Sequence, residues 1–148
     1  MPTAELTQRW EQDTIEPEKW PAQTCVSKEL EEEIKQAKTL LDLGDDWDGE
    51  GSPGYTQETL HRAIGFLTAH AERLCSKFNQ QLPVPRIGPG PNGSIDIHWK
   101  SPWELLVNIP ASPTELASFY GDNYGSQVIK GSFDPKTFNL GIVAWLMH

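Results

Sequence analysis

The sequence predicts an α+β protein in which an αα-hairpin and a C-terminal helix pack on one face of an antiparallel sheet of about four strands. Two observations predict this fold. Apolar residues recur at helical spacing in the first half of the chain, and they alternate with polar residues in the second half. Helices grouped before a run of strands are typical of α+β proteins, in which the helices lie on one face or at one end of an antiparallel sheet.

The chain has 148 residues, which is the size of one domain with a sizeable core. Residues 1–26 hold Trp10 and Trp20 among polar residues and prolines, without a sustained period. We expect a loosely packed N-terminal arm over 1–26 and a single α+β domain over 27–148.

The first predicted helix runs from an N-cap at Ser27 to about Leu43. Its apolar face carries Leu30, Ile34, Ala37 and Leu41. Glutamates crowd its first turns, where the helix dipole favours negative charge. Gly44 is a natural stop, so a turn-rich acidic loop over 44–54 follows.

A second amphipathic helix is predicted from about Thr56 to Lys77. Together with the first helix it makes an αα-hairpin joined by the acidic loop. Next, 94–100 and 103–109 show period-2 alternation and are expected to pair as a hairpin, with Asn92 and Gly93 in a tight turn before them.

Two further short strands are predicted over 116–120 and 127–133. Asp134 and Pro135 then indicate a helix start, with Asp134 as the cap and Pro135 in the first turn. Phe138, Ile142 and Trp145 share one face of that C-terminal helix.

Charge is distributed unevenly along the chain. Residues 1–60 hold 15 acidic and 5 basic side chains, whereas 61–148 hold 6 acidic and 7 basic ones. Such a field repels nucleic-acid phosphates and acidic membranes and attracts a basic partner. We therefore expect a basic protein partner, no nucleic acid and no membrane. The sequence leaves the oligomeric state open.

Cys25 and Cys75 lie far apart and follow no metal or redox spacing. The expectation is two reduced thiols in a cytoplasmic protein. No secretory signal is visible at the start, and no apolar run reaches the ~20 residues that cross a bilayer.

The acidic loop supports two interpretations. Asp46, Asp48 and Glu50 have the spacing of the first ligands of a calcium loop, but Gln57 stands where the bidentate glutamate belongs. The competing structural interpretation has Trp47 holding the loop to the core while the acidic side chains point to solvent. Asp96 and His98, on one face of a strand, are conceivable as a general-base pair, but no nucleophile is placed beside them.

Two segments resemble motifs of a known group of proteins. Residues 43–53 resemble a Trp-Asp-Gly-x-Gly loop, and 85–99 resemble a Gly-x-Ile-x-(Leu/Ile)-x-Trp strand. Both occur together in a widespread group of small bacterial proteins, and the match covers about 40–130. The chain departs from the pattern at Asp46, where Asn is usual, and at His98, where Glu is usual. The resemblance implies a compact bacterial cytoplasmic protein and brings no activity, substrate or ligand.

These observations favour a non-enzymatic, acidic protein-interaction module, such as an immunity protein, an antitoxin or another defence-related inhibitor. The alternative is a domain that binds a small molecule or a metal ion, with Asp46, Asp48 and Glu50 as the metal ligands. No catalytic residue and no cofactor are expected. The predicted partner-binding residues are Glu31, Glu32, Asp45, Asp46, Trp47, Asp48 and Glu50, with Trp10 and Trp20 as further aromatic anchors if the arm is exposed.

Overall fold

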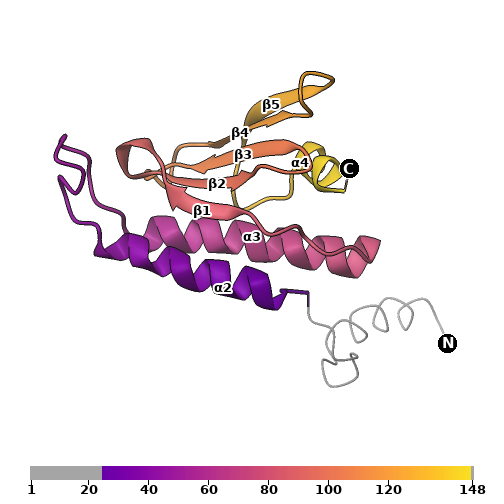
Figure 1. Cartoon of the computed structure of the whole chain (residues 1–148), viewed down its shortest axis with the longest axis horizontal. Coiled ribbons are helices and arrows are strands. Elements are labelled where there is room, and N and C mark those ends of the chain that lie inside the picture. Colours follow the sequence, from indigo (N-terminus) through magenta and orange to yellow (C-terminus); the bar gives the residue numbers. More distant parts are fainter. Residues whose placement is uncertain (1–24, 148) are drawn as a thin grey trace.

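The computed structural model describes residues 25–147. The predicted arm over 1–26, with Trp10 and Trp20, lies outside these residues except for Cys25 and Val26. The α+β class is confirmed: three α-helices accompany an antiparallel sheet that has five strands rather than about four (Figure 1).

Helix α2 spans Lys28–Ala37 and continues as the 3₁₀ helix η2, Lys38–Asp42. The predicted cap is confirmed, because the Ser27 hydroxyl accepts a hydrogen bond of 3.1 Å from the Leu30 amide. The α-helix ends six residues before the predicted Leu43. Near that end the Thr39 hydroxyl donates to the Gln36 carbonyl oxygen, a local bond of the kind that competes with regular helix.

Helix α3 spans Gln57–Phe78 and is capped by Thr56, whose side chain accepts from the Thr59 amide. It ends at Asn79, which adopts a left-handed conformation with φ of 52°. Its buried stripe repeats at helical spacing and consists of Thr59, Leu60, Ala63, Phe66, Leu67, His70, Ala71 and Leu74. The predicted second helix is thus found within one residue of its expected ends.

The sheet is a simple meander in which each strand pairs with the next. Its strands are β1 (Arg86–Pro89), β2 (Ile95–Trp99), β3 (Glu104–Ile109), β4 (Ala117–Asp122) and β5 (Val128–Phe133). The predicted hairpin is confirmed in β2 and β3, where Ile97 stands opposite Val107. Asn92 and Gly93 have positive φ values of 56° and 78° in the turn η3 (Pro91–Gly93) between β1 and β2.

Strand β1 is the strand that the sequence analysis missed. It is a short edge strand that contains a proline, and proline is tolerated in sheets chiefly at edges. The Ile87 amide, which β2 does not pair, donates a hydrogen bond of 2.9 Å to the Glu33 carboxylate of α2. Helix α2 therefore satisfies part of this edge, which would otherwise expose an unpaired donor.

The C-terminal helix begins later than predicted. Helix α4 spans Leu140–Leu146 and is capped by Asn139, whose side chain accepts from the Ile142 amide at 3.0 Å. Asp134 instead closes a turn, because its side chain and carbonyl accept from the amides of Lys136 and Thr137. Capping residues favour turns as well as helices, which explains the error.

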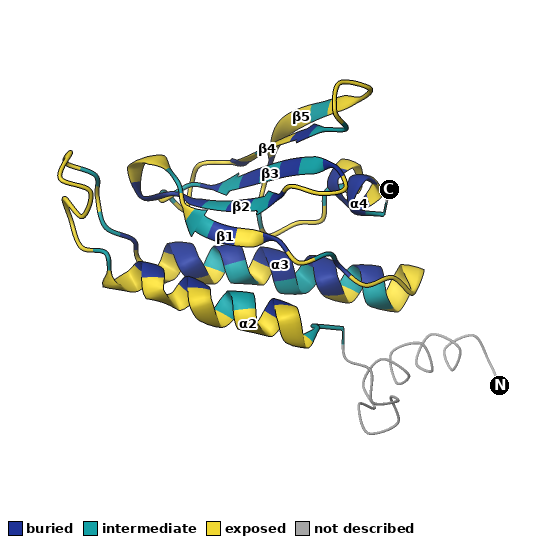
Figure 2. Ribbon diagram, viewed as in Figure 1, coloured by how far each residue is buried: buried dark blue, intermediate teal, exposed yellow. Residues whose placement is uncertain are grey.

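One face of the sheet is buried and the other is open. In β2 and β3 every second residue is buried, including the facing pair Ile97 and Val107, whereas the residues between them are partly exposed. Figure 1 shows α2 and α3 on the same side of the sheet, and Figure 2 shows the buried stripe of α3. Trp145 of α4 lies 3.0 Å from where a Cβ of Gly121 would stand, so α4 covers the β4 end of the buried face.

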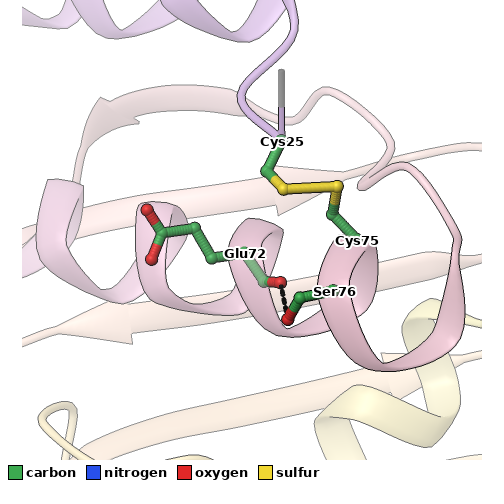
Figure 3. The surroundings of a disulfide bond; sticks show 4 residues. All are labelled: Cys25, Glu72, Cys75 and Ser76. Carbon is green, nitrogen blue, oxygen red and sulfur yellow. Dashed lines mark hydrogen bonds between the residues drawn. A yellow bond between two sulfur atoms is a disulfide. The ribbon is translucent and has the colours of Figure 1, made fainter. Parts of the chain in front are cut away.

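Cys25 and Cys75 form a disulfide, so the prediction of two reduced thiols was wrong (Figure 3). The two Cα atoms are 5.4 Å apart, although the residues are 50 positions apart in sequence. They meet because α2 and α3 are antiparallel, which places the start of α2 beside the last turn of α3. Sequence spacing alone does not reveal such a contact.

Among residues 25–147, none of the helices combines the length and the apolar character that crossing a lipid bilayer requires.

Candidate partner-binding site

The acidic loop, residues 44–54, contains most of the residues predicted to bind a partner. It joins η2 to α3 and extends beyond the end of the sheet, at the left of Figure 1. Asp45, Asp46, Trp47, Asp48 and Glu50 are all exposed there. The backbone closes the loop at its base, because the Asp46 amide donates to the Ser52 carbonyl oxygen at 2.6 Å.

Hydrogen bonds between aspartate carboxylates and other groups of the loop hold the loop in one conformation. Asp45 accepts a hydrogen bond from the Gly54 amide at 2.8 Å, and Asp46 accepts one from the Gly51 amide at 2.6 Å. Asp48 accepts from the Glu50 amide at 2.9 Å and from the Ser52 hydroxyl at 2.5 Å. Hydrogen bonds to charged acceptors are stronger than neutral ones. The negative charges are therefore held in defined positions on an exposed loop.

Hydrogen bonding keeps Asp48 ionised. The Ser52 hydroxyl and the Glu50 amide lower the pKa of the Asp48 carboxyl below its ordinary value, because they stabilise the charged form. This aspartate thus carries its full charge throughout the neutral range.

Trp47 does not hold the loop to the core, so that part of the structural interpretation was wrong, whereas the acidic residues are exposed as it expected. Its side chain is 37% exposed, and its indole Nε1 donates to the Pro53 carbonyl oxygen at 3.2 Å within the loop itself. The ring lies 6.0 Å from the ring of Tyr55 at an interplanar angle of 50°. The structure places an oriented, half-exposed aromatic beside the ordered carboxylates.

Tyr55 is the residue that anchors the loop. It is buried, and its hydroxyl donates to the Gly90 carbonyl oxygen at 2.9 Å in the turn between β1 and β2. Burial, together with the charges of Asp48 and Asp96, raises the pKa of the Tyr55 hydroxyl. This role of Tyr55 was not predicted from the sequence. The available signal was an apolar residue directly before the Thr56 cap, a position that commonly packs against the first helical turns.

Glu31 and Glu32 are exposed but are not brought into the acidic loop. They lie in the early turns of α2, whereas the loop follows η2. The intervening residues separate them from the loop by at least about 15 Å along the helix axis. The seven predicted residues therefore form two areas of surface, and the loop is the one with ordered charges.

The proposed metal ligands are engaged differently from a calcium loop. Asp46 and Asp48 accept loop amides, as described above, and the Glu50 side chain takes no part in these bonds. In the part of the chain that the structure describes, no group of three or more His, Cys, Asp or Glu side chains is arranged to hold a metal ion.

The conceivable general-base pair has separate partners. The His98 imidazole Nε2 lies 2.7 Å from the Glu104 carboxylate across the β2–β3 hairpin. Asp96 accepts a hydrogen bond from the Asn108 side chain at 2.8 Å. Both side chains lie on the open face of the sheet, and neither hydrogen-bonds the other.

Comparisons with known protein families, curated proteins and solved structures find no match to this chain. The resemblance to the group of small bacterial proteins stays a prediction.

Proposed function

We propose that the protein is a non-enzymatic interaction module whose acidic loop docks on a basic protein surface, as an immunity protein, an antitoxin or a related inhibitor does. The observation that carries this proposal is the internal ordering of the loop. Three carboxylates are fixed by loop hydrogen bonds beside the half-exposed Trp47 ring. A surface already ordered before binding loses less conformational freedom on association.

Charge and aromatic content both support a protein partner. Clustered negative charge steers a basic surface into contact and can raise association rates by ~10–1000-fold at low salt. Tryptophan is enriched among the few residues that dominate binding energy at interfaces. The loop offers both, and its anchor to the β1–β2 turn through Tyr55 ties it to the sheet.

A cytoplasmic location stays a prediction, and the Cys25–Cys75 disulfide is a bond more typical of oxidising compartments.

The test is quantitative affinity capture from native lysate, with the immobilised protein, at low and at high salt. Glu50→Lys reverses a charge that makes no side-chain hydrogen bond within the loop, so the loop itself should stay folded. Glu72→Lys makes the same change at an exposed position on α3, outside the predicted site (Figure 3). We expect Glu50→Lys and Trp47→Ala to abolish capture of a basic partner that the wild type and Glu72→Lys retain. Equal capture by all four proteins would contradict the proposal.

A further inference from the structure

A cavity of about 330 Å³ lies between α3 and the segment that follows β5. Its size falls at the lower end of the range for small-molecule sites. The α3 side supplies His61, Arg62, Gly65, Phe66 and Ala69, and the segment supplies Pro135, Lys136, Thr137 and Phe138. None of these residues belongs to the acidic loop.

Gly65 keeps one wall of the cavity open. It lies in the interior of α3, where glycine is unfavourable compared with alanine. Apart from its chain neighbours and the backbone of its own helical turns, no atom lies within 4 Å of the position that its Cβ would occupy, so packing within the described chain gives no reason for a glycine there. A side chain at this position would enter the cavity.

The charged residues of the cavity are all basic, in a chain with 21 acidic and 12 basic residues. The Arg62 guanidinium donates to the carbonyl oxygens of Pro110 and Ala111 at 2.9 Å each, to that of Ser112 at 3.4 Å, and to the Thr59 hydroxyl at 3.3 Å. These acceptors fix the side chain without carrying a formal charge, so they do not neutralise it. Lys136 is exposed at the opposite wall.

Apart from His61 and Thr137, the rest of the lining is apolar, and contacts hold its two aromatic rings in place. Phe66 is buried, and Phe138 forms the facing aromatic wall. The Phe138 ring lies 5.2 Å from the His70 ring, and the Arg73 guanidinium carbon lies 3.8 Å from its centroid. Such a cation–π contact restrains the ring. The turn before it is closed by Asp134, which accepts the Lys136 amide at 2.9 Å.

We propose that this cavity binds a small organic anion. Its apolar body would lie against Phe66 and Phe138. Its carboxylate or phosphate group would accept hydrogen bonds from the Lys136 ammonium, and Arg62, whose terminal nitrogens already have acceptors, would contribute positive charge. A positive rim over an apolar lining suits a ligand that has an apolar body and an anionic group. A purely apolar molecule would leave the positive rim without a partner, and a fully hydrated ion would not contact the apolar lining. This site is separate from the acidic loop and does not depend on the function proposed for it.

The probes are benzoate and phenyl phosphate, with benzamide as an uncharged compound of nearly the same shape as benzoate. Each is titrated into the full-length ¹⁵N-labelled protein while backbone amide shifts are followed. We expect the better anion to bind at least about tenfold more tightly than benzamide, with shifts centred on Gly65, Ala69 and Thr137. Whichever of benzoate and phenyl phosphate binds more tightly shows whether the site prefers a carboxylate or a phosphate group. Equal binding of benzamide and both anions, or no binding of either anion, would overturn the proposal.

Two variants with matched controls localise the site. Gly65→Leu fills the cavity and should abolish the shifts, whereas Ser76→Leu, exposed further along α3, should leave them unchanged. Lys136→Gln should weaken anion binding at least threefold without affecting benzamide, and Lys130→Gln on β5 should change neither. Wild-type affinity in Gly65→Leu would show that the anion binds elsewhere and would refute the assignment.

Discussion

The Tyr55 hydroxyl donates a hydrogen bond of 2.9 Å to the carbonyl oxygen of Gly90, which lies 35 residues further along the chain. This bond joins the base of the acidic loop to the turn between β1 and β2. The orientation of the loop relative to the sheet therefore depends on this contact and not only on the residues of the loop. The loop's charges and the Trp47 ring are therefore presented from a fixed base.

Removing that hydroxyl tests the anchor. Tyr55→Phe keeps the buried ring and leaves the Gly90 carbonyl without its partner, so we expect a loss of about 1 kcal/mol in the free energy of unfolding. Urea denaturation measures the loss, and hydrogen exchange of the Gly51 and Gly54 amides reports on the loop. Faster exchange at these amides is expected, whereas Tyr120→Phe, on the open sheet face, should leave their exchange unchanged. Unaltered loop exchange in Tyr55→Phe would show that the loop is ordered without this bond.

The disulfide should contribute substantially to stability. Cys25 and Cys75 are 50 positions apart, and closing a loop of that length stabilises a folded chain by about 2–4 kcal/mol through the unfolded state. Cys25→Ser combined with Cys75→Ser should lower the free energy of unfolding by that amount. Adding dithiothreitol to the wild type should produce the same loss and should not affect the double variant. A wild-type stability that is insensitive to the reductant would contradict the expectation.

Two glycine substitutions should have opposite effects. A Cβ at Gly121 would lie 2.9 Å from an Ile129 side-chain carbon and 3.0 Å from the Trp145 ring, so Gly121→Ala should destabilise the protein by about 1–3 kcal/mol. Gly65→Ala meets no atom within 4 Å and should stabilise α3 by up to about 1 kcal/mol. Thermal and urea unfolding measure both. Equal effects of the two substitutions would exclude the packing of Trp145 on Gly121.

His70 should make the protein sensitive to acid. It is 1% exposed, and its ring Nδ1 lies 2.9 Å from the Phe66 carbonyl oxygen, which fixes the proton on Nδ1 in the neutral ring. Burial lowers the His70 pKa below 6.5; the bond to Phe66 raises it by less, and the Arg73 charge lowers it further. Below about pH 6.5 the unfolded chain then binds a proton that the folded chain does not, so stability falls as the pH drops towards the folded-state pKa.

The measurement is the free energy of unfolding between pH 7.5 and pH 5, in wild type and in His70→Leu. The variant should lose less stability than the wild type over this range, because it lacks the titrating group. His61→Gln, which removes an exposed histidine on the same helix, should keep the wild-type dependence. Parallel curves for wild type and His70→Leu would refute the assignment.

The sequence by itself determined the elements whose signals are local. The Ser27 cap, the start of the second helix near Thr56, the helical spacing of the apolar residues and the alternation in β2 and β3 are all found in the structure. These features depend on neighbours within a few residues, which is why periodicity and capping rules predict them. The position of the acidic loop was also predicted from a local signal, namely its composition.

Tertiary structure decided the features that depend on residues distant in sequence. Edge strand β1 exists because β2 pairs with it and Glu33 of α2 accepts its Ile87 amide. The disulfide follows from the antiparallel course of α2 and α3, and the loop's orientation follows from the bond between Tyr55 and Gly90. The disulfide, the bond between Tyr55 and Gly90 and the bond between Ile87 and Glu33 each join residues at least 35 positions apart, and no local pattern encodes which of these segments meet.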